Sequence, residues 1–232
     1  MDSIKTLKEL MASLGIEIKD MDLYDEALTH NSWANETGNS KTYQRLEFLG
    51  DAILQMKVSE YLFGNFVTFN EGSLTKYRSA MVREESLSFV AKNLDLGKYI
   101  KLGIGEINSK GHEKASMLCD VFESLTAAIY LDQGLEKVNS WLEQTLFKVD
   151  NVTHFIEQTH DYKSELQELI QLDNRNELEY KVIDKVTNDY NQTTFKVAVM
   201  IGSKIYGTGE GQNKKAAEQL AAKSAISKMK KG

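Results

Sequence analysis

Two residue types are scarce in this 232-residue sequence, which has no proline and a single cysteine, Cys119. One cysteine excludes an intrachain disulfide. Because Cys119 stands among apolar residues, we interpret it as a buried structural thiol and not as a nucleophile. Without proline, the turns must be formed by Gly, Asn, Asp and Ser.

Long hydrophobic runs and a signal sequence are also missing. No apolar run is long enough to span a membrane, and no N-terminal signal pattern is present. We therefore expect a cytoplasmic protein that makes no contact with membranes. With 41% hydrophobic residues the composition is that of an ordinary globular protein, and the length allows one large domain or two modest ones.

Positive charge is outnumbered, because 28 Lys and Arg face 34 Asp and Glu and give a net charge of −6. Taken alone, this excess of acid argues against a nucleic-acid partner. Its distribution changes that interpretation. Residues 1–150 hold 16 basic and 23 acidic residues, whereas the stretch from Lys196 onward holds 8 basic and 2 acidic ones. The acidic half could bind a polyanion only with the help of metal ions. We therefore predict that the basic part binds the nucleic acid.

Two acids stand in the otherwise apolar stretch YQRLEFLGDAIL, Tyr43–Leu54. If this stretch is helical, Glu47 and Asp51 are four residues apart and lie on one face. An isolated pair of this kind is usually a solvated stripe on an amphipathic helix. Here apolar residues flank the pair on both sides, and carboxylates in such a setting are costly unless a cation compensates them.

A second pair of acids changes the balance. Asp120 and Glu123 are the only charged residues in Met117–Leu131, and they are spaced i,i+3 on what must be a largely buried helix. Two such helices can pack so that four carboxylates converge. With no Cys or His expected nearby, these carboxylate oxygens suit a hard cation, Mg²⁺ or Mn²⁺, rather than zinc. Such a centre can activate a water against a phosphodiester and stabilise the leaving oxygen.

The amino-acid sequences of both acidic stretches match a specific family signature. RLEFLGDAIL resembles the signature of the ribonuclease III family, and the second acidic run resembles that family's second motif. The resemblance implies an endonuclease that hydrolyses double-stranded RNA with Mg²⁺, which Mn²⁺ can replace. It also implies 5′-phosphate and 3′-hydroxyl ends and a role in processing rRNA precursors and mRNA. By position, the metal ligands are Glu47, Asp51, Asp120 and Glu123, with Asp51 and Glu123 as the catalytic residues.

Further positions follow from the same resemblance. It implies a homodimer in which Phe48 inserts into the partner subunit, and a place in the intrachain core is the alternative for this side chain. Glu71 matches an acidic position at the edge of the site, and Gln44 stands where the family commonly has Glu. His30 lies in ALTHNSWANE, which resembles the family's ALTHRS segment. A single histidine without a clear partner is more often structural, so we leave His30 out of the chemistry.

Residues 161–232 follow a different pattern. An amphipathic helix is predicted over Tyr162–Leu172, three strands follow, and an alanine-rich helix is predicted over Lys214–Met229. This αβββα order, with two lysines opening the last helix, resembles the double-stranded-RNA-binding domain. A helix N-terminus favours phosphate, and A-form RNA is read by its shape and its 2′-hydroxyls. The RNA-contact candidates are Ser164, Gln167, Glu168, Gln171, Asn191, Lys214 and Lys215.

Two features of this part qualify the contact set. For the polar candidates on the first helix, an ordinary solvated face is the alternative. The loop between the first two strands departs from the family's usual Gly-Pro-x-His pattern and reads NDYN over Asn188–Asn191.

The predicted fold is an all-α endonuclease domain at 1–150, a linker at 151–160 and a small α+β (αβββα) double-stranded-RNA-binding domain at 161–232. The linker is assigned because this stretch breaks the apolar periodicity. A binding protein that keeps the fold without the chemistry stays open, although a pure binder gains nothing from repelling carboxylates. A DNA nuclease with a similar metal cluster is the other alternative, which a domain that reads RNA shape disfavours.

Overall fold

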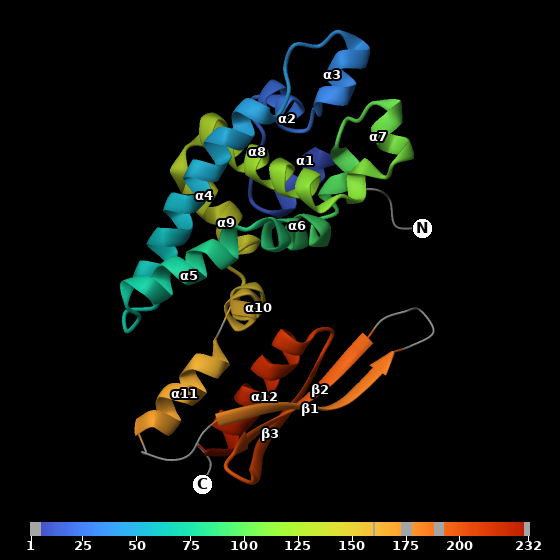
Figure 1. Cartoon of the computed structure of the whole chain (residues 1–232). Helices are drawn as coiled ribbons and strands as arrows, with labels where there is room; N and C mark the ends of the chain where they lie inside the picture. Colours follow the sequence, from blue (N-terminus) through green and yellow to red (C-terminus); the bar gives the residue numbers. More distant parts are fainter. Residues whose placement is uncertain (1–5, 160, 173–177, 188–192, 230–232) are drawn as a thin grey trace. The chain divides into compact units, whose positions relative to one another are not determined.

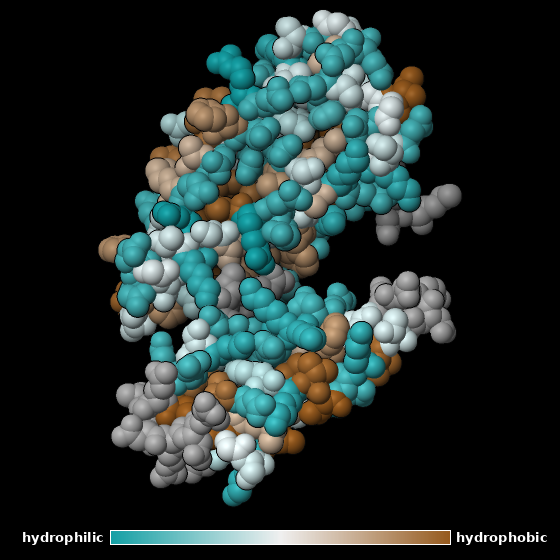
Figure 2. All heavy atoms as spheres, in the orientation of Figure 1, coloured by the Kyte–Doolittle hydropathy of each residue, from teal (hydrophilic) through white to brown (hydrophobic). Residues whose placement is uncertain are grey.

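The computed structural model describes residues 6–159, 161–172, 178–187 and 193–229. The chain divides into two compact units, Met1–Thr159 and His160–Gly232, and each is described by itself (Figure 1). Hydrophilic residues cover most of the visible surface of each unit, interrupted by separate hydrophobic patches (Figure 2). Within the described part of the chain, no helix combines the length and the apolar character needed to cross a lipid bilayer.

The first unit is helical apart from one isolated parallel β-bridge between Thr29 and Lys101, with short 3₁₀ turns at Leu96–Tyr99 and Gly111–Glu113. Its α-helices are α1 (Leu7–Ser13), α2 (Met21–Ala27), α3 (Asn31–Thr37), α4 (Gln44–Asn65), α5 (Glu71–Val82), α6 (Glu84–Asn93), α7 (Ile104–Asn108), α8 (Ala115–Gln133), α9 (Leu135–Gln144) and α10 (Val149–Thr159).

Polar residues and glycine define the helix ends in this proline-free chain. Thr6 and Glu9 form a capping box at the start of α1, and Asn70 caps α5 by accepting a hydrogen bond from the Ser73 N–H at 2.9 Å. Gly38 ends α3 with φ 72°, a left-handed conformation that glycine adopts without a steric penalty.

Helix α8 is the centre of the first unit, packed against α2, α4, α6 and α9. Most of its side chains are buried, which explains why its sequence is apolar apart from the two acids. Its few buried polar groups are all paired. Ser124 Oγ donates to the Ala27 carbonyl oxygen at 2.7 Å, and Thr126 Oγ1 accepts from Trp141 Nε1 at 3.1 Å.

The expected linker at 151–160 differs from the structure, because residues 149–159 form α10, which packs against α5. Val152 and Phe155 belong to the hydrophobic core of the first unit with 5% and 1% exposure. The spacing of Val152, Phe155 and Ile156 is that of one face of a helix, a two-turn signal that the surrounding polar residues obscure. The boundary between the two units therefore falls at Thr159 and not at residue 150.

The second unit consists of α11 (Tyr162–Leu172), β1 (Leu178–Thr187), β2 (Thr193–Ile201), β3 (Lys204–Gly211) and α12 (Lys214–Met229). The strands form one antiparallel sheet in the order β1-β2-β3. Both helices share a core with the sheet, to which α11 contributes Leu166, β2 contributes Val199 and α12 contributes Ala221. The predicted class, an all-α domain followed by an αβββα domain, is confirmed.

Helix α12 packs on β3 at very short range. A Cβ on Gly207 would lie 2.3 Å from the carbonyl oxygen of Ala221, and a Cβ on Gly209 would lie 2.3 Å from the nitrogen of the same residue. The helix and the strand thus touch backbone to backbone, and this contact fixes where the N-terminus of α12 lies.

Candidate active site

The two acidic stretches meet because α4 and α8 touch at Gly50. A Cβ on Gly50 would lie 1.9 Å from the carbonyl oxygen of Glu123, closer than any side chain permits. Glu47 precedes this contact by about one turn and Asp51 follows it directly, so both acids of α4 face the acids of α8. The predicted packing of the two acidic helices is therefore present in the fold, whereas the ligand atoms that lie within 4.8 Å of one another among the described residues belong to Cys119, Asp120 and Glu123 and not to Glu47 or Asp51.

The four carboxylates repel one another. Burial raises the pKa of Glu123 to about 8, and the charges of Asp51, Asp120 and Glu47 add to the effect. Burial also raises the pKa of Glu47, with Asp120 and Asp51 contributing. Among the described residues, no lysine or arginine nitrogen lies within 4.0 Å of any of the four carboxylates. The centre is thus partly buried and acidic, and of the described residues His30, but no lysine or arginine, places positive charge near it.

Tyr43 forms a hydrogen bond with Asp120, a contact that sequence reasoning missed. It is 4% exposed, and its Oη donates a hydrogen bond to Asp120 Oδ2 at 3.1 Å. Burial raises the pKa of Asp120, and the hydrogen bond from Tyr43 works in the opposite direction. The sequence contains a signal for this role, because Tyr43 lies four residues before Glu47, the spacing that places two side chains on one helix face.

His30 has the structural role that was predicted for it. Its Nδ1 accepts a hydrogen bond from the Ser32 N–H at 3.1 Å and so caps α3. Its ring lies 5.7 Å from that of Tyr43, centroid to centroid. His30 therefore supports the tyrosine that contacts Asp120 and does not itself join the carboxylates.

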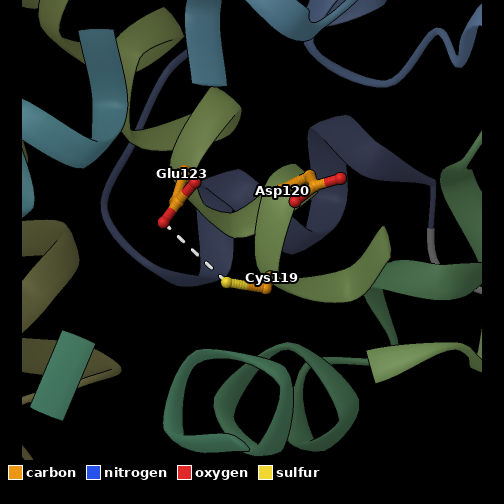
Figure 3. Close-up of side chains that lie close together, drawn as sticks. All are labelled: Cys119, Asp120 and Glu123. Carbon is orange, nitrogen blue, oxygen red and sulfur yellow. Dashed lines mark hydrogen bonds between the residues drawn. The ribbon is translucent and has the colours of Figure 1, made fainter. Parts of the chain in front are cut away.

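Cys119 is buried, as predicted, but it lies inside the acidic centre. Its Sγ is 3.8 Å from Glu123 Oε1, to which the thiol donates a hydrogen bond. One ligand atom each from Cys119, Asp120 and Glu123 lies within 4.8 Å of the other two, and Figure 3 shows the three side chains on α8. The expectation that no cysteine belongs to the cluster was wrong, because the i,i+4 spacing from Cys119 to Glu123 was overlooked.

Asp51 and the two positions assigned to the edge of the site are all exposed. Gln55 Nε2 donates to Asp51 Oδ1 at 3.4 Å, and Glu71, in the first turn of α5, accepts from Thr75 Oγ1 at 3.1 Å. Gln44 is the first residue of α4. Glu71 also lines a cavity of about 620 Å³ between α4 and α5, whose other lining residues include Phe63.

Phe48 is not an intrachain core residue. Its side chain is 82% exposed on α4, beside Glu47, and Phe63 on the same helix is 77% exposed. Phe63 lines the cavity between α4 and α5, whereas Phe48 does not. An exposed aromatic side chain of this size is of the kind that another protein surface covers.

The RNA-contact candidates of α11 lie on its exposed side. Ser164, Gln167 and Glu168 are exposed, and Ser164 Oγ donates to Asp161 Oδ2 at 2.8 Å. Gln171 belongs to α11, but its side chain lies outside the described residues, as does Asn191.

Lys214 and Lys215 are the first two residues of α12, and both are exposed. Asn213 precedes them and caps the helix by accepting from the Ala216 N–H at 2.9 Å. No acidic group of the described residues lies within 4.0 Å of either ammonium group. Two lysines thus add charge to the positive end of the helix dipole.

Known proteins share both units. A family model described as Ribonuclease-III-like matches residues 20–149, and one described as Double-stranded RNA binding motif matches residues 162–229. A protein of Mesoplasma florum named Ribonuclease 3 is 52% identical over 227 residues, which are 97% of this chain and 98% of that protein. The chain belongs to the ribonuclease III family.

Other members of the ribonuclease III family are also similar to this chain. Ribonuclease 3 of Listeria monocytogenes is 41% identical over 225 residues, covering 96% of this chain and 97% of that protein. A solved structure of the nuclease domain of ribonuclease III from Campylobacter jejuni is 38% identical with a TM-score of 0.56, and the match covers 66% of this chain and 98% of that one. The resemblance inferred from the two acidic motifs is confirmed.

Proposed function

We propose that this chain is a ribonuclease III that hydrolyses phosphodiester bonds of double-stranded RNA with Mg²⁺, leaving 5′-phosphate and 3′-hydroxyl ends. The observation that carries the proposal is the packing of α4 against α8 at Gly50, which places two acids of each helix near enough to raise the pKa of Glu123, with no described lysine or arginine in a salt bridge to them. The second unit, matched by a double-stranded-RNA-binding motif, supports the choice of substrate.

The donor set fits a hard divalent cation. Glu47, Asp51, Asp120 and Glu123 offer carboxylate oxygens, the ligands that Mg²⁺ and Mn²⁺ prefer. Such an ion, when bound, lowers the pKa of a water and stabilises charge on a phosphodiester oxygen. These four residues would hold the ion, with Asp51 and Glu123 in the catalytic roles. Tyr43 orients Asp120 through its hydrogen bond, so one carboxylate is already positioned before the ion binds.

RNA binding is assigned to the second unit. Lys214 and Lys215 contact phosphates at the N-terminus of α12, where backbone N–H groups also favour anions. The exposed face of α11, with Ser164, Gln167 and Glu168, contacts the minor groove of the A-form duplex. We assign to the protein a cytoplasmic location and substrates among rRNA precursors and mRNA.

The active form is a homodimer, with one acidic centre in each copy. The support within this chain is Phe48, an aromatic side chain that is 82% exposed next to the metal ligand Glu47. Replacing Phe48 by Ala should shift the protein toward monomer in sedimentation equilibrium. Val149→Ala is the matched control, because Val149 is 77% exposed on α10 and should leave the dimer intact.

Cleavage of a long RNA duplex with and without Mg²⁺ tests the function directly. The unaltered chain should cut the RNA only with the metal, leave duplex DNA of the same length intact, and give 5′-phosphate ends. Glu123→Gln keeps the side-chain shape but removes the charge. It should still bind RNA and should cleave about 10³-fold more slowly, the equivalent of about 4 kcal/mol of transition-state stabilisation.

Mixed dimers sharpen this test. If each copy carries a complete centre that cuts one strand, a dimer with one intact subunit and one Glu123→Gln subunit should nick the duplex. Two different tags allow the mixed dimer to be purified, and labels on each strand report the cuts. Efficient cutting of both strands in one binding event would rule out one centre per strand. Full activity of the homodimeric variant would remove Glu123 from the site.

A further inference from the structure

One polar side chain on the exposed face of α11 has its hydroxyl proton already in use. Ser164 Oγ lies 2.8 Å from Asp161 Oδ2 and donates a hydrogen bond to it, because an ionised carboxylate can only accept. Ser164 is exposed, and no group of the described residues donates to its Oγ. The oxygen is therefore open to solvent as a hydrogen-bond acceptor, while its proton is directed at Asp161.

Asp161 is held in place by two further donors. It precedes α11 and caps the helix, with Oδ1 accepting from the Ser164 N–H at 3.2 Å. From α12, Gln219 Nε2 donates to the same oxygen at 2.9 Å, while Gln219 Oε1 accepts from the Lys163 N–H at 3.3 Å. Both ends of the Gln219 amide thus contact the start of α11. All three of these contacts bring a donor to the Asp161 carboxylate, which fits its ionised form.

A salt bridge beside these contacts fixes the start of α11 further. Lys163 Nζ lies 2.6 Å from Glu218 Oε2 on α12, and the same ammonium group lies 4.6 Å from the ring centroid of Tyr180 on β1. The first turn of α11 is therefore tied to both α12 and the sheet. Because Asp161 is part of this turn, the direction of the Ser164 hydroxyl is set before any RNA binds.

A hydroxyl oxygen that can only accept distinguishes RNA from DNA. The minor groove of A-form RNA presents 2′-hydroxyls, which can donate a hydrogen bond, whereas the sugar of DNA has no such donor. Adenine N3 and thymine O2, the groups of an A·T pair in the minor groove, are acceptors and cannot pair with an oxygen whose proton is taken. Donation to a charged carboxylate also strengthens the Ser164 oxygen as an acceptor.

We propose that Asp161 is a specificity-determining residue for RNA, which acts by holding the Ser164 hydroxyl as an acceptor for a ribose 2′-hydroxyl. Asp161 is a positioning residue, and Ser164 makes the contact. This inference rests on the proposed function, because it uses the RNA-contact face assigned to α11. It adds the group that makes this face selective for ribose.

Binding of the full chain to two duplexes of the same A·U sequence, one of RNA and one with 2′-fluoro sugars, tests the proposal. Both duplexes take the A form, but fluorine cannot donate a hydrogen bond. Guanine, whose amino group donates in the minor groove, is absent from both. Metal-free buffer prevents cleavage during the measurement. The unaltered chain should bind the RNA more tightly, and Ser164→Ala should lower the ratio of the two affinities about fivefold, the effect of one hydrogen bond.

Asp161→Asn separates the direction of the hydroxyl from the shape of the site. Asparagine caps a helix as well as aspartate does, but its Nδ2 donates to Ser164 Oγ and so releases the hydroxyl proton. The affinity ratio should fall as far as it does in Ser164→Ala, and the double variant should fall no further. Asp184→Asn, at an exposed position on β1, removes the same charge and should keep the ratio of the unaltered chain.

The proposal is overturned if either Asp161→Asn or Ser164→Ala keeps the affinity ratio of the unaltered chain, or if Asp184→Asn lowers it as much. Mg²⁺-dependent cleavage of duplex RNA, with a ratio that does not depend on Asp161, would overturn this inference and leave the proposed function standing. A chain that binds duplex RNA with an Asp161-dependent ratio and does not cleave it would support the inference and overturn the function.

Discussion

Tyr43 and Asp120 are joined by a hydrogen bond across 77 residues of sequence, with the Tyr43 hydroxyl donating to Asp120 Oδ2 at 3.1 Å. The bond connects the residue that precedes α4 to the first acid of α8. It leaves the second oxygen of Asp120 free of this contact, so the carboxylate has a fixed orientation while it still offers a ligand atom. A metal centre gains affinity when its ligands are oriented before the ion arrives.

Tyr43→Phe should therefore weaken metal binding without abolishing the fold. A hydrogen bond to a charged group contributes about 1.5 kcal/mol, so we expect the Mn²⁺ affinity to fall about tenfold. Isothermal titration with Mn²⁺ measures this. Tyr24→Phe is the matched control, because Tyr24 Oη donates to Asp132 at 3.2 Å in the same unit. The role of Tyr43 is excluded if both variants bind Mn²⁺ like the unaltered chain.

Gly50→Ala should destabilise the first unit. The added Cβ would lie 1.9 Å from the carbonyl oxygen of Glu123, so α4 and α8 must separate. We expect a loss of about 3 kcal/mol in the free energy of unfolding, at the upper end of overpacking costs. Gly64→Ala on the same helix meets nothing within 4 Å and should stabilise by about 0.5 kcal/mol. Urea unfolding of the two variants should show opposite signs, and equal effects would contradict the close contact.

Lys214→Ala with Lys215→Ala should weaken binding to all RNA duplexes alike. Each lost phosphate contact reduces the slope of log affinity against log salt by about one, so the double variant should lose about two. Lys204→Ala with Lys228→Ala removes the same charge from exposed positions away from the helix N-terminus and should keep most of the slope. A changed sequence preference with an unchanged salt slope would argue against phosphate contacts.

The metal-free protein should become less stable as the pH rises. The pKa of Glu123 is raised to about 8 in the folded chain, above the value of 4.5 for a free side chain. Between these values the folded state holds a proton that the unfolded state releases, so the free energy of unfolding falls with increasing pH. Allowing for solvent screening, we expect a loss of about 2 kcal/mol between pH 5 and pH 8.

Urea unfolding in the presence of a chelator measures this pH dependence. Glu123→Gln should flatten it, and added Mg²⁺ should restore stability at pH 8 because the ion binds only the folded state. If Glu123→Gln loses as much stability over this pH range as the unaltered chain, a group other than Glu123 causes the pH dependence.

Spacing within single helices predicted much of this structure. The i,i+4 and i,i+3 pairs predicted two acids on one face of each of two helices, and these helices pack on each other. The change of period after residue 160 separated an all-α unit from an αβββα unit. Contacts between side chains of different helices were harder to predict, because they depend on how those helices pack in the folded chain. Tyr43 reaches Asp120 only when α4 and α8 pack, and that packing depends on Gly50, whose role is to lack a side chain. Helix α10 was missed because two buried residues, Val152 and Phe155, decide it within a polar stretch.

The short contact between β3 and α12 has a consequence for RNA recognition. Where Gly207 and Gly209 face Ala221, no rotatable side chain separates the strand from the helix. The distance is therefore set by covalent backbone geometry, which varies far less than the packing of larger side chains. Lys214 and Lys215 begin a helix held in this way. If they contact phosphates as proposed, the spacing of their Cα atoms is constant, and only their flexible side chains adjust to the duplex.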